Sequence, residues 1–230
     1  MPRWRPATPD SRLVPRRTWR AWRLPVALVV TLAPLAGWAP VAGAAIILND
    51  VVVRVYDNTG LPSLVRRTSL TRAAEIFARA EVEIGWVHCP ARCGRAPSPD
   101  QLILRMTRSP ATAMGLGSSM IDPVLQAGRL ATVYVDQVDA AARRSNTARE
   151  VILSRAIAHE IGHLLLGTAE HTRSGLMRGI WTVEELRRNQ VEDWQFSPFQ
   201  RTVLRARLAA GNPARWNAGV PKVSPGRTGS

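Results

Sequence analysis

The order of its segments predicts that this 230-residue chain forms a single domain of the α+β class. A β-branched run near residue 50 precedes a helical pattern, several short strand-like runs follow it, and the last third carries helical signals. Hydrophobic residues make up 46% of the chain, which is enough for a buried core and excludes a disordered protein. No internal repeat is present.

The first half of the predicted domain is a sheet with one helix. Residues 46–56 are rich in Val and Ile and predict a strand, which the turn residues Asp57-Asn58-Thr59-Gly60 end. Apolar residues at helical spacing predict an amphipathic helix over about 69–80. Further strands are predicted at 81–87, 102–106 and 131–136, a loop at 90–99, and either a strand or a loop at 113–118.

Helices are predicted for the second half. Thr147 and Glu150 form a capping-box pattern and Gly167 is a typical stop, so a long helix should cover about 148–166. The same pattern recurs before two further helices, at Thr182 with Glu185 and at Ser197 with Gln200. From Gly211 the chain has no acidic residue and is rich in Pro, Gly and Ser, which predicts a flexible basic tail over 211–230. The folded domain is therefore expected at 45–210.

The formal charge of +14 comes from 31 Lys and Arg against 17 Asp and Glu, and much of it belongs to the front of the chain. Seven arginines lie before residue 24, where Asp10 is the only acid: Arg3, Arg5, Arg12, Arg16, Arg17, Arg20 and Arg23. The uncharged, apolar stretch from Leu24 to Ala45 follows, with Ala42-Gly43-Ala44 near its end. This order is typical of a secretory signal cleaved after Ala44. We therefore expect residues 1–44 to direct export to the periplasm or the medium.

Two alternatives remain open for the type of export signal. Arg16-Arg17 resembles the arginine pair of a twin-arginine signal. Leu24 to Ala45 is also long enough to cross a bilayer as an uncleaved anchor. Pro and Gly residues interrupt the stretch and its end is rich in Ala, which favours cleavage, so no stable membrane span is expected afterwards.

The two cysteines, Cys89 and Cys93, are separated by three residues. In an oxidising compartment they can close a small loop as a disulfide. The alternative is one half of a zinc site, but the chain offers no second cysteine pair. A structural disulfide is the prediction, and it agrees with export.

The motif that carries chemistry is His159-Glu160-Ile161-Gly162-His163, late in the long predicted helix. Histidines four residues apart share one helix face and can bind one zinc ion. Glu160 lies beside the open coordination position, where it can act as general base on a zinc-bound water. The alternative is that both histidines are ordinary helical residues satisfied by hydrogen bonds. We favour the zinc site because a third histidine, His171, follows the helix stop closely enough to fold back.

The run from His159 through Gly167 and His171 to Met177 resembles the metzincin branch of zinc metallopeptidases. Their pattern is His-Glu-x-x-His-x-x-Gly-x-x-His, followed by a methionine-containing turn. This chain has one extra residue before the glycine and one extra residue after it. The glycine-break and Gly-x-Met pattern is also similar to a group of exported bacterial proteins.

The resemblance implies a zincin-like fold, with a mixed, twisted sheet of 4–5 strands, an active-site helix and C-terminal helices. It implies that one zinc ion is bound by His159, His163 and His171, with Glu160 as the base and Met177 in the turn. It also implies a substrate-binding edge strand near Gly115, Leu116 and Gly117. Three other residues remain candidates for the third ligand: Glu170, Glu184 and Glu185.

The leading hypothesis is an exported zinc metalloendopeptidase that hydrolyses peptide bonds, with a peptide or protein as its partner. A zinc-binding envelope protein without turnover is the first alternative. Nucleic-acid binding, suggested by the charge, is not expected, because the basic residues of 45–230 are scattered or paired rather than gathered in one stripe. The protein is expected to be a monomer.

Overall fold

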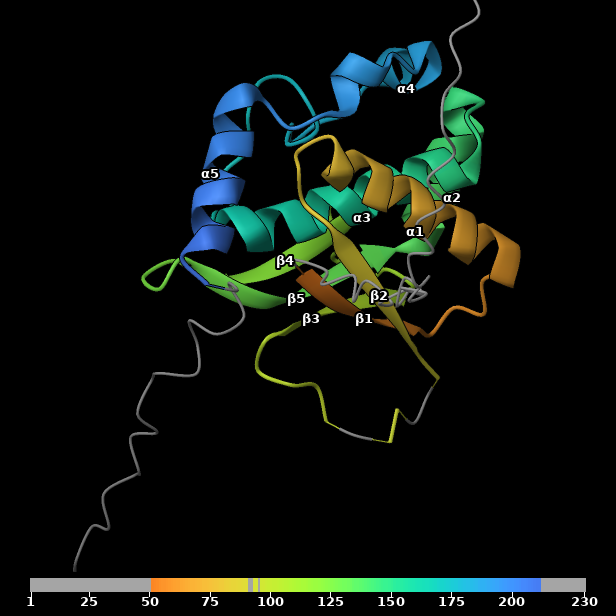
Figure 1. Cartoon of the computed structure of the whole chain (residues 1–230). Coiled ribbons are helices and arrows are strands. Elements are labelled where there is room, and N and C mark those ends of the chain that lie inside the picture. Colours follow the sequence, from red (N-terminus) through yellow and green to blue (C-terminus); the bar gives the residue numbers. More distant parts are fainter. Residues whose placement is uncertain (1–50, 91–92, 95, 212–230) are drawn as a thin grey trace, which may run out of the picture. The chain divides into compact units, whose positions relative to one another are not determined.

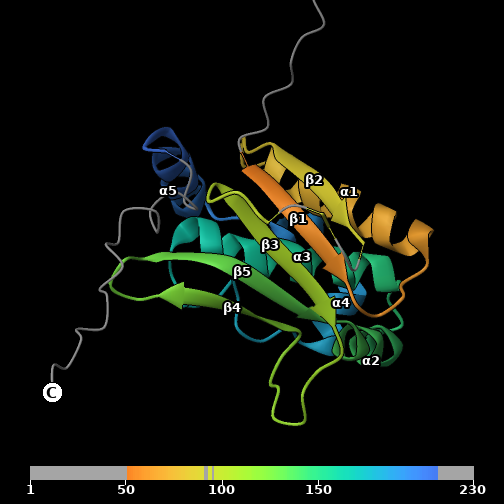
Figure 2. The ribbon, with the colours of Figure 1, turned by 90° about the horizontal axis from the view of Figure 1, so that it is seen from below.

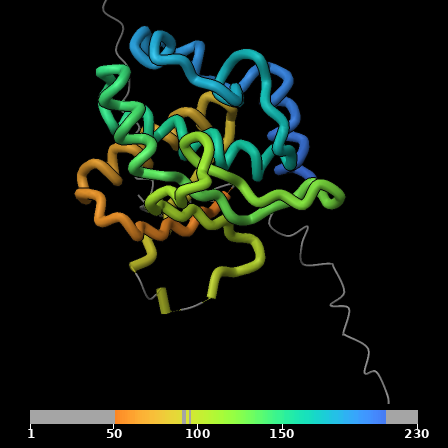
Figure 3. The backbone as a smooth tube through the Cα atoms, turned by 180° about the vertical axis from the view of Figure 1, so that it is seen from behind, coloured from red at the N-terminus to blue at the C-terminus, as the bar shows by residue number. Residues whose placement is uncertain are grey.

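The structure, a computed structural model, describes residues 51–90, 93–94 and 96–211. These residues form a five-stranded mixed sheet and a layer of helices on one of its faces, seen from two opposite sides in Figures 1 and 3. The strands are β1 (Val51–Asp57), β2 (Ile84–Cys89), β3 (Gln101–Thr107), β4 (Gly117–Asp122) and β5 (Ala127–Tyr134). The helices are α1 (Ser63–Ala78), α2 (Val135–Ser145), α3 (Arg149–Leu166), α4 (Val183–Arg188), the 3-10 helix η1 (Val191–Trp194) and α5 (Pro198–Ala209). The predicted α+β class with a mixed sheet is confirmed.

The sheet has the order β2-β1-β3-β5-β4, and β4 forms one of its edges. β1 pairs in parallel with β2 and β3, and β3 pairs in parallel with β5, whereas β4 runs antiparallel to β5. Figure 2 shows the strands from below, with α1, α3 and α4 behind them. This arrangement leaves the outer side of β4 without a strand partner in the sheet, next to the helix that carries the His-Glu motif.

Helix α3 is the centre of the core. Every residue from Ile152 to Leu166 is buried, because α3 packs against α1 on one side and against β4 and β5 on the other. A helix that is buried all round normally carries apolar residues only. Here the buried set includes Arg155, His159, Glu160 and His163, so four ionisable groups are held inside the protein.

Helix α3 ends where the sequence predicts. Gly167 adopts a left-handed conformation with a φ of 67°, and its N–H donates to the His163 carbonyl oxygen at 2.9 Å. A Cβ atom at this glycine would lie 2.2 Å from the Gln126 carbonyl oxygen and the same distance from the Arg207 guanidinium. Gly167 therefore both ends the helix and lets the chain turn back beside it.

Several sequence predictions are corrected by the structure. The helix predicted at 69–80 begins earlier, at Ser63. Its first two turns contain few apolar residues, so the apolar spacing does not show them, and Arg66 there forms an ion pair with Asp57 at 3.0 Å. The strand predicted at 131–136 ends at Tyr134. The next residues begin α2, a helix that was not predicted from the sequence. The ambiguous segment 113–118 leads into β4, which begins at Gly117.

The predicted capping box of α3 is wrong. Its N-cap is Ala148, without a side-chain cap, because the Thr147 hydroxyl lies 3.1 Å from the Leu186 carbonyl oxygen and 3.4 Å from that of Ser145. The capping boxes at Thr182 and Ser197 are both present.

Some predictions concern residues outside the described part of the chain: the export signal at 1–44, the start of the first strand at 46–50, and the tail from 212 onward. The boundaries of the folded domain therefore stay a prediction. None of the described helices is long and apolar enough to cross a membrane.

Candidate metal centre and active site

The structure brings the three histidines of the motif region together at one point. The Nε2 atoms of His159 and His163 are 3.0 Å apart, and the Nε2 atom of His171 is 3.3 Å from each. Among the described residues, these three form the one group of His, Cys, Asp or Glu side chains arranged to hold a metal ion. His159 and His163 come from the buried face of α3, and His171 from the exposed loop that follows it.

Hydrogen bonds identify which ring nitrogens carry protons. The Nδ1 atoms of His159 and His163 lie 2.9 Å and 2.7 Å from the carbonyl oxygens of Leu176 and Thr168. A carbonyl oxygen only accepts, so both Nδ1 atoms carry the proton and donate it. In the neutral rings the Nε2 atoms then have no proton and cannot hydrogen bond to each other.

The histidine cluster fits a zinc ion. Nitrogen ligands about 2.0–2.1 Å from one ion at tetrahedral angles lie about 3.3–3.4 Å from each other, which is close to the observed separations. Without a cation, at least two lone pairs would face each other at 3.0 Å. Backbone carbonyls that fix the tautomer of histidine ligands are also typical of zinc sites. The donor set and its spacing therefore suit zinc.

Burial keeps the histidines of α3 neutral. It lowers the pKa of His159 to about 4, although the hydrogen bond to the Leu176 carbonyl oxygen acts in the opposite direction. It also lowers the pKa of His163. Neutral imidazole is the form that binds metal, so these two side chains are ready to act as ligands at neutral pH.

The loop after α3 folds back to place His171. The Thr172 N–H donates to the Met177 carbonyl oxygen at 2.9 Å, which ties the start of the loop to the methionine turn. Gly179 lies against the other side of His171, and a Cβ atom there would lie 3.0 Å from the imidazole Cγ. The extra residues in this loop, compared with the metzincin pattern, therefore do not prevent the third histidine from reaching the other two.

Met177 is fully buried and packs against α3. A Cβ atom at Gly162, within the His-Glu motif, would lie 2.8 Å from the Met177 sulfur and 2.9 Å from the ring of Phe196. The missing side chain at Gly162 thus lets the methionine turn and Phe196 pack directly against the helix that carries the histidines. Met177 contributes packing beneath the cluster.

Glu160 points from α3 toward the edge strand β4. The Ser119 hydroxyl lies 2.6 Å from Glu160 Oε2 and 2.7 Å from the Glu160 carbonyl oxygen. Burial raises the pKa of Glu160 to about 7, and the hydrogen bond with Ser119 acts in the opposite direction. Because Ser119 has one hydroxyl proton, it can donate to the carbonyl oxygen only while a protonated carboxyl donates to Ser119. The carboxyl is therefore held where it can take up and release a proton near neutral pH.

Gly117 makes the close approach of Glu160 and β4 possible. A Cβ atom at this position would lie 2.5 Å from the Thr132 carbonyl oxygen and 2.7 Å from Glu160 Cγ. Of the predicted edge residues, Gly117 begins β4, while Gly115 and Leu116 precede it and line the same pocket. The Leu116 carbonyl oxygen accepts a hydrogen bond from the Tyr134 N–H at 2.8 Å, so the segment continues the pairing with β5.

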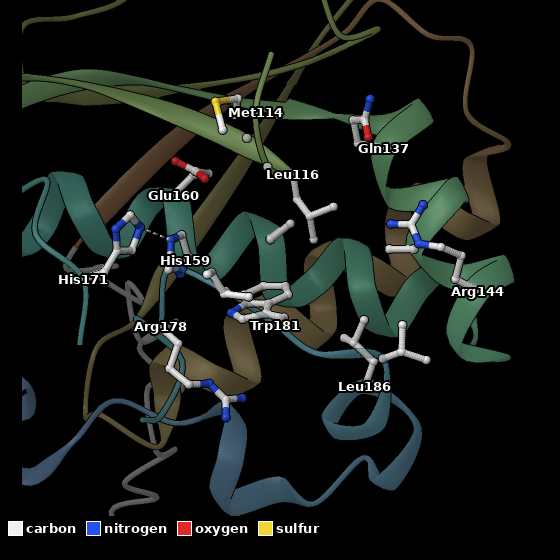
Figure 4. Close-up of a pocket in the computed structure, with 17 residues that line it drawn as sticks. Met114, Leu116, Gln137, Arg144, His159, Glu160, His171, Arg178, Trp181 and Leu186 are labelled. Atoms are coloured by element: carbon white, nitrogen blue, oxygen red, sulfur yellow. Dashed lines mark hydrogen bonds between the residues drawn. The ribbon is translucent and has the colours of Figure 1, made fainter. Parts of the chain in front are cut away.

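A pocket of about 540 Å³ opens beside this cluster and is lined by two of its histidines (Figure 4). His159, His171 and Glu160 lie at one end, and Trp181 separates them from an arm between α2 and α4. Arg178 lines the pocket but is almost fully buried, and it forms an ion pair with Glu185. The charge of Arg178 is thus matched within the protein.

The alternative third ligands lie elsewhere. Glu185 accepts hydrogen bonds from Thr182 and Arg178, and the bonds from Thr182 are the main reason that its pKa is lowered. Glu184 forms an ion pair with Arg187 at 3.6 Å, and Glu170 is exposed. None of the three belongs to the histidine cluster.

The predicted disulfide is present, between Cys89 at the end of β2 and Cys93. It does not line the pocket beside the histidines. The two cysteines therefore have a structural place and no part in the candidate metal centre.

Comparisons with known proteins give one finding of note. No protein-family model and no curated protein matches the chain. Among solved structures, the crystal structure of an archaemetzincin from Methanopyrus kandleri is similar with a TM-score of 0.49 and 15% sequence identity. The match covers 69% of this chain and 96% of the archaemetzincin chain.

Two parts of the site were not found from the sequence. Ser119 lies on a strand, 41 residues before the carboxyl that it contacts, and a half-buried serine gives no signal of such a role in the sequence. The pocket face of α2, with Gln137, Ala141 and Arg144, was missed with the helix itself. A period of three to four residues through Val135, Val138 and Ala141 is the signal that could have found it.

Proposed function

We propose that the protein is a zinc-dependent peptidase, with one zinc ion held by His159, His163 and His171. One observation supports this most strongly: three imidazole Nε2 atoms converge within 3.3 Å of one another, beside a pocket that two of these histidines and a buried carboxyl line. Zinc at this position would supply a Lewis acid that polarises a substrate carbonyl and makes water nucleophilic near neutral pH.

Glu160 acts as the general base. Ser119 contacts Oε2, and no other described side chain hydrogen bonds to this carboxyl, so Oε1 is the atom that accepts the proton of the attacking water. The same oxygen then gives the proton to the leaving amine. A pKa raised to about 7 by burial suits both transfers, because the carboxyl is close to half protonated at neutral pH.

The edge strand β4 aligns the substrate. In the sheet β4 pairs with β5 alone, and the pocket runs along the segment that leads into it. A peptide that adds to the outer side of β4 as a further strand would pass the histidine cluster in extended form. The narrow backbone at Gly115 and Gly117 leaves room for that approach.

Export belongs to the same proposal. The disulfide between Cys89 and Cys93 supports an oxidising compartment, because such bonds are rare in reducing cytosol. The periplasm or the surrounding medium is then where the peptidase acts, after export directed by residues 1–44.

A zinc-binding protein without turnover is the alternative. Burying Glu160 beside the histidines is costly, and a purely structural site has no use for it. The test is cleavage of a peptide library by the zinc-loaded protein, with a chelator control and Glu160→Gln as the matched variant. We expect cleavage that the chelator abolishes and that Glu160→Gln lowers by about 10²–10⁴-fold at equal zinc content. Equal cleavage by both proteins would exclude Glu160 as the base.

A further inference from the structure

The pocket continues beyond the histidine cluster into an arm that has its own chemistry. Its walls between α2 and α4 are mostly apolar and come from buried Ala141, Ala156 and Leu186, with Leu116 and Trp181 on the side of the cluster. Gln137 of α2 is the polar residue of this wall. Figure 4 shows Arg144 at the far end of this arm from His159, His171 and Glu160. The arm is therefore a mostly apolar passage with a cation at its end.

The charge of Arg144 is not matched inside the protein. Arg144 is exposed, and within the described part of the chain no residue forms an ion pair or hydrogen bond with its guanidinium. Arg178, the other arginine of the pocket, is buried and paired with Glu185. Glu160 is the one acidic residue of the pocket lining, and it lies at the opposite end. A cation in this position favours an anionic group at the end of the arm.

Building on the proposed peptidase function, we propose that this arm is a substrate subsite for a carboxylate carried on an apolar stem. Leu116, Trp181 and Leu186 hold the stem, and the Arg144 guanidinium binds the carboxylate. A glutamate side chain near the scissile bond and the free C-terminal carboxylate of a short substrate both have this chemistry. The preferred substrates are then peptides that are acidic close to the bond cleaved.

The chain offers a matched control on the same helix. Arg143 is the neighbouring arginine, is also exposed in the last turn of α2, and does not line this pocket. Arg143→Glu and Arg144→Glu change the net charge of the protein equally and act equally on the helix dipole. Only Arg144→Glu reverses the charge at the end of the arm.

The experiment compares kcat/KM for paired peptides that carry Glu, Gln or Lys at each position around the cleaved bond, and that end in a free acid or an amide. We expect the wild type to prefer the carboxylate of one pair by about three- to tenfold, the range between an exposed ion pair and a buried charged hydrogen bond. Arg144→Glu should reverse this preference toward Lys or the amide, and Arg143→Glu should keep it. The peptide position at which the preference appears distinguishes a glutamate side chain from a free C-terminal carboxylate as the group bound.

Calorimetric binding of the same peptides to zinc-loaded Glu160→Gln separates this proposal from the one on which it builds. Cleavage without any charge preference, or an equal shift in Arg143→Glu and Arg144→Glu, would overturn the subsite and leave the peptidase function standing. Charge-selective binding by Glu160→Gln that adding Arg144→Glu to this variant reverses, with no cleavage by the wild type, would support the subsite and overturn the peptidase function.

Discussion

Gly117→Ala tests whether the contact between β4 and Glu160 positions the base. The added Cβ atom would lie 2.5 Å from the Thr132 carbonyl oxygen and 2.7 Å and 2.8 Å from Cγ and Oε1 of Glu160. Real Cβ atoms essentially never lie under 3.0 Å from such atoms. The Thr132 oxygen belongs to the backbone of β5, which is held by its pairing with neighbouring strands and cannot move by itself. The added Cβ atom is therefore pushed toward Glu160, and the Glu160 side chain has to move.

The magnitude follows from these distances. Overpacking of this kind costs about 1–3 kcal/mol of the free energy of unfolding. A shift of the base by several tenths of an ångström, up to about 1 Å, should lower kcat/KM by up to about 10²-fold. Zinc content should not change, because the three atoms nearest to the added Cβ belong to Thr132 and Glu160 and none to a histidine.

The assay measures kcat/KM on one peptide, zinc by mass spectrometry and unfolding in urea. Ser118→Ala is the control, because Ser118 is the next residue of β4 and its hydroxyl lies on the exposed side, 3.1 Å from the Tyr134 hydroxyl. Ser118→Ala should keep nearly wild-type activity. Wild-type activity in Gly117→Ala, or loss of zinc in parallel with activity, would refute the positioning role of β4.

Three further predictions follow from neighbouring contacts. Ser119→Ala removes the hydrogen bond to Glu160 and should lower kcat/KM about tenfold with zinc retained, whereas an unchanged rate would show that the bond does not matter. Gly162→Ala crowds Met177 and Phe196 and should lower the free energy of unfolding by about 1–3 kcal/mol in urea titrations; full stability would mean that this packing is loose. In the metal-free protein, burial lowers the pKa of His159 from 6.5 to about 4 in the folded state, so the unfolded chain binds this proton first as the pH falls. The free energy of unfolding should therefore decrease by up to about 3 kcal/mol between pH 6.5 and 4. Glu160 acts in the opposite direction, because its folded-state pKa of about 7 adds stability as pH falls from 7 toward 4.5. Metal-free Glu160→Gln should therefore lose stability in acid more steeply than the metal-free wild type, and equal slopes would contradict these pKa shifts.

The sequence predicted the parts of the fold that depend on local signals. The glycine stop at Gly167 and the capping boxes at Thr182 and Ser197 involve residues a few positions apart, and the structure contains all three. Helix α2 was missed because it directly follows a β-branched strand, and its N-cap, Tyr134, makes no side-chain cap. The α3 cap failed because Thr147 contacts Leu186, 39 residues away, which no local pattern shows.

The candidate site also has a part that local sequence signals predict and a part that only the folded chain brings together. The spacing of His159, Glu160 and His163 places them on one helix, and a glycine stop allows His171 to return to them. The contact between Ser119 and Glu160 depends on how an edge strand packs against a helix. The charge at the end of the pocket depends on α2, so it too became visible only in the folded chain.

The most direct test of the account is the zinc content of the purified full-length protein and of His171→Ala after dialysis against a weak chelator. Three imidazole nitrogen atoms at this spacing predict one zinc ion per wild-type chain and a large loss of zinc from His171→Ala. A wild-type protein without zinc, or a His171→Ala variant that keeps a full equivalent, would contradict the three-histidine centre and the function proposed from it.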